Sequence, residues 1–100
     1  MIDKKIAEKA VECLQQEVRI ILLTEWDPIG INHLSACADE YDSYVGGAIG
    51  LLMRKSTDAE LADYFRQIET EKMGIAPGEA AIERAVQALH RIQLPSFLQS

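Results

Sequence analysis

The residues of this chain best suited to chemistry lie close together, between positions 26 and 44. His33 and Cys37 are four residues apart, so an α-helix would place both on one face. There, an imidazole and a thiolate can bind a metal ion or form a nucleophilic pair. Asp27, Asp39 and Asp42 are nearby carboxylates that could complete such a site. One interpretation is therefore a small metal-dependent or thiol enzyme that uses His33, Cys37 and these carboxylates.

Other features of the same stretch argue against that interpretation. A reactive thiolate needs electropositive surroundings, whereas the residues that follow Cys37 are acidic. The acidic run DEYD at residues 39–42 lacks the glycine and the ligand spacing of a calcium loop. The chain also has no GxGxxG, P-loop, GxSxG or HExxH motif. We therefore expect a protein that is not an enzyme, with no catalytic residue, no metal ligand and no cofactor.

Acidic and aromatic residues give the stretch a second interpretation, as a binding surface for another protein. Residues 20–53 contain five acidic residues and no Lys or Arg, together with the single Trp of the chain. Aromatic side chains anchor interfaces, and acidic side chains attract a basic partner. The predicted partner-binding residues are Trp26, Asp27, Asp39, Glu40, Tyr41, Asp42 and Tyr44.

Architecture is the alternative explanation for these same residues, and the sequence leaves it open. An Asp before a Pro commonly accepts hydrogen bonds from the amides of its own turn, which suits Asp27. Asp39 is placed to cap a helix, and Tyr41 and Tyr44 continue the apolar stripe of that helix.

The composition limits the class of protein. One hundred residues, 48% of them hydrophobic and 26% charged, are typical of a single globular domain, here spanning residues 1–100. A formal net charge of −6 disfavours nucleic acids and anionic membrane surfaces as partners. The longest apolar run, VGGAIGLLM, is too short to cross a bilayer. The charged N-terminus does not resemble a signal peptide, and the two cysteines do not form a disulfide framework, so we expect a cytoplasmic protein.

Apolar residues recur at spacings of three and four along most of the chain, which predicts an all-α bundle of four helices. The predicted helices span about residues 3–23, 39–55, 58–73 and 77–93. Asp3 is the expected N-cap of the first helix, Asp39 or a neighbour is the expected N-cap of the second, and Thr57-Asp58-Ala59-Glu60 is a capping box for the third. Gly74 is expected to end the third helix, and Pro77 to lie in the first turn of the fourth.

Two segments carry further expectations. Pro28 and Gly30 should end the first helix and form a WDP loop, which its apolar residues should keep ordered against the core. Gly46, Gly47 and Gly50 should each destabilise the second helix by about 1 kcal/mol relative to Ala. Close approach of another helix is the expected compensation, and a structural homodimer formed through this glycine face is a third interpretation.

Several motifs resemble those of a known group of proteins. Trp26-Asp27-Pro28-Ile29-Gly30 and Asp39-Glu40-Tyr41-Asp42-Ser43-Tyr44, followed by Leu51-Leu52, Leu61-Ala62-Asp63-Tyr64 and Ile68-Glu69, are similar to those of a family of small, uncharacterised, all-helical bacterial proteins. The resemblance covers most of residues 20–74 and implies the fold but no activity. By analogy of size and charge, a concrete form of the binding interpretation is an immunity-type partner of a basic bacterial toxin.

Overall fold

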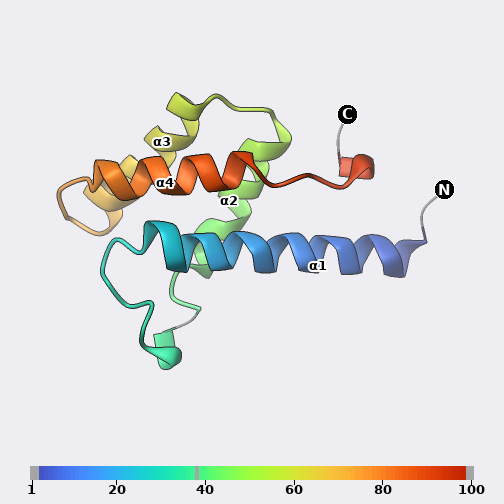
Figure 1. Cartoon of the computed structure of the whole chain (residues 1–100), viewed down its shortest axis with the longest axis horizontal. Coiled ribbons are helices and arrows are strands. Elements are labelled where there is room, and N and C mark those ends of the chain that lie inside the picture. Colours follow the sequence, from blue (N-terminus) through green and yellow to red (C-terminus); the bar gives the residue numbers. More distant parts are fainter. Residues whose placement is uncertain (1–2, 38, 99–100) are drawn as a thin grey trace.

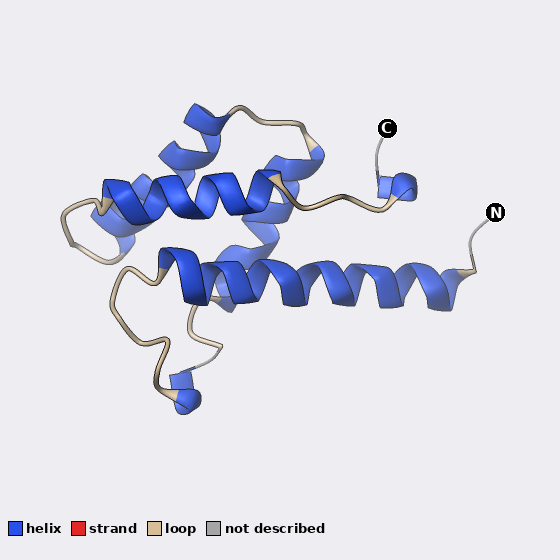
Figure 2. Cartoon of the chain, viewed as in Figure 1, coloured by secondary structure: helices blue, strands red, loops and turns tan. Residues whose placement is uncertain are grey.

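The computed structural model describes residues 3–37 and 39–98. Its four α-helices are α1 (Lys4–Ile21), α2 (Asp42–Met53), α3 (Asp58–Gln67) and α4 (Glu79–His90), which pack into one bundle (Figure 1). Short 3₁₀ turns occur at Ser35–Cys37 and Ser96–Leu98. All regular elements of the described residues are helical (Figure 2). The prediction of an all-α bundle of four helices is therefore confirmed.

α1 ends at Ile21, two residues before the predicted end at residue 23, but a π-helical turn continues its path to Trp26. Asp3 caps it as expected, because its Oδ1 accepts a hydrogen bond from the amide of Lys5 at 2.8 Å. After α1, the chain makes one π-helical turn, Leu22–Trp26, which we call the first π-turn. Asp27 ends it in the left-handed conformation, with φ +32°, one residue before Pro28.

A second π-turn, Ile68–Lys72, follows α3 directly. The two π-turns have related sequences, LLTEW and IETEK, with Thr and Glu at the same positions. In both, the Thr hydroxyl donates to the carbonyl four residues earlier: Thr24 to Ile20 at 2.8 Å and Thr70 to Arg66 at 3.0 Å. This bond satisfies a carbonyl where the regular helical pattern changes, and such Thr bonds commonly bend helices.

Predictions for the ends of α3 are largely confirmed. Thr57 and Glu60 form the expected reciprocal capping box, with bonds of 2.8 and 3.1 Å. Gly74 has the left-handed conformation, φ +67°, that was expected after the helix. The predicted end at residue 73 is one residue too late, because the second π-turn ends at Lys72.

The predicted starts of the second and fourth helices are wrong. α2 begins at Asp42 and not at residue 39, and its cap position is taken by Tyr41 without a side-chain bond. Asp39 contributes its backbone carbonyl, which accepts from the amide of Asp42 at 3.1 Å. Tyr41 enters the core here, so the chain turns before the helix can form.

α4 runs from Glu79 to His90 and begins two residues later than the predicted start at residue 77. Gly78 is the residue that precedes it. The Gly78 amide donates to the buried carboxylate of Glu69 at 2.9 Å, which holds this residue outside the helix. Pro77 therefore lies before the helix and not in its first turn. The far end is also earlier than the predicted residue 93, because the α-helix ends at His90 and the amides of Arg91 and Ile92 bond to carbonyls three residues earlier.

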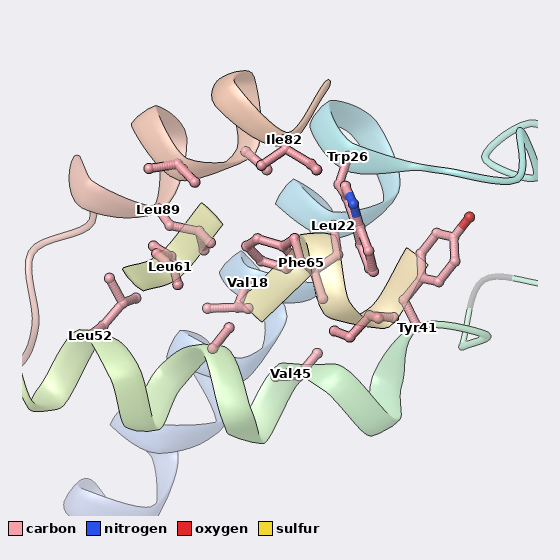
Figure 3. Packing of buried hydrophobic residues seen from close by; sticks show 14 of the residues in the cluster. Val18, Leu22, Trp26, Tyr41, Val45, Leu52, Leu61, Phe65, Ile82 and Leu89 are labelled. Atoms are coloured by element: carbon pink, nitrogen blue, oxygen red, sulfur yellow. The ribbon is translucent and has the colours of Figure 1, made fainter. Parts of the chain in front are cut away.

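The core contains fifteen buried hydrophobic residues from all four helices and the π-turns. Ten of them are labelled in Figure 3: Val18, Leu22, Trp26, Tyr41, Val45, Leu52, Leu61, Phe65, Ile82 and Leu89. The first π-turn packs against α4, and α1 packs against α2. The N-terminal half of α1 extends beyond the bundle (Figure 1), and Ile6 on it is 60% exposed. Ile2, the first member of the predicted α1 stripe, lies outside the described residues.

Glycines of α2 differ in their surroundings. A Cβ atom at Gly47 would lie 2.2 Å from the hydroxyl oxygen of Tyr64, whereas one at Gly46 or Gly50 would meet nothing within 4 Å. The expected close approach of another helix is therefore confirmed at Gly47 alone, where Tyr64 of α3 is the neighbour. Among the described helices, none combines the length and hydropathy of a membrane span.

Candidate functional site

The WDP loop is held by a network centred on Asp27. One carboxylate oxygen of Asp27 accepts from the Ile31 amide and from the Tyr41 hydroxyl, both at 2.8 Å, and the other accepts from the Asn32 amide at 3.2 Å. The Tyr41 hydroxyl also accepts from the Ile29 amide at 3.4 Å. Burial and the neighbouring Asp27 carboxylate raise the pKa of Tyr41 well above its ordinary value. We call the Asp27–Tyr41 pair the loop brace.

Trp26 lies in the core, one residue before the loop brace. It is 1% exposed, and its ring centroid lies 4.8 Å from that of Phe65 and 5.3 Å from that of Tyr41 (Figure 3). Its indole Nε1 donates to Glu69 Oε2 at 3.1 Å. Trp26 and Tyr41, which is also 1% exposed, were predicted to bind a partner. In this structure, both instead pack beneath the surface and support the loop.

Asp42 and Tyr44, at the start of α2, were also predicted to bind a partner, and both are partly engaged within the chain. Arg19 of α1 donates to both carboxylate oxygens of Asp42, at 2.8 and 2.5 Å. Tyr44 is half-buried and makes an edge contact with Trp26 at 5.9 Å. Arg19 lies just outside residues 20–53 and neutralises Asp42. The folded protein therefore has fewer unpaired negative charges in this region than the sequence alone suggests.

Residues 28–37 and 39–40 leave the bundle beside the end of α1 (Figure 1), and we call these residues the projecting loop. Asp39 and Glu40, the remaining predicted binding residues, are both exposed on it. Two large hydrophobic side chains are also exposed there, Ile29 at 47% and Leu34 at 44%. The projecting loop therefore combines exposed apolar side chains with uncompensated acids.

His33 and Cys37 do not share a helical face. The segment contains a single 3₁₀ turn, Ser35–Cys37, which begins after His33, so the spacing argument for a two-ligand site does not apply. His33 is exposed and Cys37 is half-buried. Within residues 3–37 and 39–98, no three side chains of His, Cys, Asp or Glu are grouped so that they could hold a metal ion.

Glu69 is a residue that the sequence interpretation did not single out. It is 2% exposed and is the one buried charged side chain of the described residues. Its two carboxylate oxygens accept from the Trp26 indole and the Gly78 amide. A signal was present in the sequence, because Leu61, Phe65 and Glu69 follow each other at intervals of four, so that Glu69 continues the apolar face of α3 into the second π-turn.

Comparison of the chain with protein-family models, with curated proteins and with solved structures gave no match. The resemblance of the WDPIG and DEYDSY motifs to a family of small bacterial proteins therefore stays a prediction.

Proposed function

We propose that this protein is a non-enzymatic binding protein that docks another, basic protein through its projecting loop. The observation that carries the proposal is the exposure of Ile29 and Leu34 on a loop that the loop brace holds in place. A loop that is ordered before binding loses little conformational entropy when the partner docks. Exposed loops fixed on a rigid scaffold are common binding elements in proteins.

Electrostatics supports a basic partner. Asp39 and Glu40 are exposed on the same loop as Leu34, and no Lys or Arg occurs between residues 20 and 53. Uncompensated acids accelerate association with a basic protein at low ionic strength, and salt screens this effect. Apolar side chains at the centre of the contact supply the affinity that salt does not weaken. A basic toxin, for which this protein would act as the immunity partner, is a concrete form of this proposal.

The experiment is partner capture from cells of the source organism, followed by measurement of the affinity for any basic protein that is retained. In the test variant, Asp39 and Glu40 are both replaced by Lys. In the matched control, Glu8 and Glu12, two exposed acids of α1, are both replaced by Lys, which gives the same change in net charge. A Leu34→Ser variant tests the apolar part.

We expect the loop charge variant to bind at least tenfold more weakly at low salt and the α1 variant to bind as the wild type does. We also expect Leu34→Ser to weaken binding at every salt concentration. Equal losses in the two charge variants would show that net charge, and not the projecting loop, attracts the partner. Light scattering of concentrated protein tests the homodimer interpretation, and metal analysis of protein purified without chelators tests the metal-enzyme interpretation.

A further inference from the structure

A cleft of about 300 Å³ lies where the two π-turns meet. Its walls come from the first π-turn and the WDP loop, from the segment between the second π-turn and α4, and from α4 itself. Trp26 and Glu69 both line it, and they are hydrogen-bonded to each other. This volume is at the lower end of the range for ligand pockets, so the cleft suits a small molecule. Pro28 and Asn32 of the projecting loop also line it, whereas Ile29 and Leu34 do not.

The charges that line the cleft are not balanced. Glu69 is buried, yet its two hydrogen-bond donors, an indole and a backbone amide, are neutral, and no Lys, Arg or His of the described residues forms an ion pair with it. Fully buried Glu residues are almost always paired with a positive charge. Glu25 and Asp27 also line the cleft, and Arg84 is its single positive residue.

The acidic side chains of the cleft differ in how many hydrogen bonds they already accept. Asp27 already accepts three hydrogen bonds within the WDP loop. Glu69 accepts one hydrogen bond on each oxygen, which leaves lone pairs for a further donor. Within the described residues, the side chains of Glu25 and Arg84 form no ion pair. The cleft therefore offers acceptors and negative charge in excess.

We propose that this cleft binds a small organic cation with an ammonium or guanidinium group, held by Glu69 at its base and by Glu25 at its wall. The cation supplies the positive charge that the buried Glu69 lacks, and its N–H groups donate to the free lone pairs of the carboxylates. Arg84 opposes the bound charge and so limits the affinity. This proposal does not depend on a protein partner at the projecting loop.

Titration with butylammonium and butylguanidinium chloride tests the proposal, and the binding is followed by NMR. Trp26 is the single Trp of the chain, so its indole N–H gives one assignable signal beside Glu69. The Gly78 amide is a second reporter on the same carboxylate. We expect both signals to shift and to saturate with either cation. We expect no saturable shift with n-butanol or with sodium chloride at the same ionic strength.

Three variants test the roles of the charges. Glu25→Gln should weaken butylammonium binding about threefold, and Arg84→Gln should strengthen it about threefold, because the charge opposing the cation is removed. Glu71 occupies in the second π-turn the position that Glu25 occupies in the first, but it does not line the cleft. Glu71→Gln is therefore the matched control and should leave the affinity unchanged.

Two results would overturn the proposal. The first is the absence of a saturable shift of the Trp26 and Gly78 signals with both cations. The second is weaker binding in Arg84→Gln, because the cleft would then be selecting a ligand through its positive residue. The side chains of Glu25 and Arg84 form no ion pair within the described residues, so their variants are expected to fold and the test does not require a change at Glu69.

Discussion

The Tyr41 hydroxyl offers the sharpest test of the loop brace. Tyr41→Phe keeps the ring that packs 5.3 Å from Trp26 and removes the donor that lies 2.8 Å from Asp27 Oδ1. A hydrogen bond to a charged group contributes about 1.5–3 kcal/mol. We expect the substitution to lower the free energy of unfolding at neutral pH by about 2 kcal/mol, or roughly 8–16 °C in Tm for a domain of this size.

The difference in the free energy of unfolding between wild type and Tyr41→Phe should depend on pH. The pKa of Tyr41 is raised in the folded state, by burial first and by the hydrogen bond to Asp27 second. The hydroxyl therefore contributes its full stabilisation below the unfolded pKa of about 10 and loses it as the pH rises towards the folded pKa. The difference in the free energy of unfolding between wild type and Tyr41→Phe should therefore decrease as the pH rises above about 10.

Urea unfolding followed by far-UV circular dichroism, from neutral to alkaline pH, measures both quantities. Tyr44→Phe is the matched control, because no hydrogen bond or ion pair of the Tyr44 hydroxyl occurs within the described residues. We expect that variant to stay within about 0.5 kcal/mol of the wild type at neutral pH. A stability of Tyr41→Phe equal to that of the wild type at neutral pH, or a difference that stays constant up to pH 11, would refute the loop brace.

Three further predictions follow from the fold. Gly47→Ala should destabilise the protein in urea unfolding, because its Cβ would lie 2.2 Å from the Tyr64 hydroxyl oxygen, whereas Gly50→Ala should stabilise it by about 0.5–1 kcal/mol. Glu69→Ala should cost about 3 kcal/mol in the same assay, because the Trp26 indole and the Gly78 amide would both lose their acceptor; an effect below 1 kcal/mol would contradict this. The hydrogen bond from the Thr57 amide lowers the pKa of Glu60 in the folded state. The Glu60 carboxylate therefore stabilises the fold at pH values above the ordinary pKa of Glu, and this stabilisation is lost as the pH falls through the lowered pKa. The stability of Glu60→Gln should depend less on pH between about pH 5 and pH 3 than that of the wild type.

Local signals in the sequence were sufficient for the helices and some of their ends. The capping box at Thr57 and the left-handed Gly74 depend on neighbouring residues alone, so they were predictable. The starts of α2 and α4 were not, because the residues that precede them, Tyr41 and Gly78, make contacts with Asp27 and Glu69 that a local sequence pattern does not show. The π-turns escaped prediction because a helical apolar pattern does not distinguish them from the α-helices that they continue.

The sequence predicted where the candidate site lies in the chain, but not which of its side chains are exposed. The stretch around residues 26–44 does contain the projecting loop, but the sequence could not show which of its side chains face the solvent. Trp26 packs against Tyr41 and against Phe65, which lies far away in the chain, and Asp42 pairs with Arg19 of another helix. Residues 20–53 contain five acidic residues, but the fold leaves only some of them exposed, among them Asp39 and Glu40.

Backbone hydrogen exchange of the free protein and of the protein with its captured partner tests the central proposal most directly. The proposal predicts that the amides of the projecting loop, especially those around Ile29, Leu34 and Glu40, exchange more slowly when the partner is bound. Amides of α4 and of the exposed N-terminal half of α1 should exchange at the same rate in both samples. Slower exchange confined to α1 or α4, with no change in residues 28–40, would contradict the proposal that the projecting loop binds the partner.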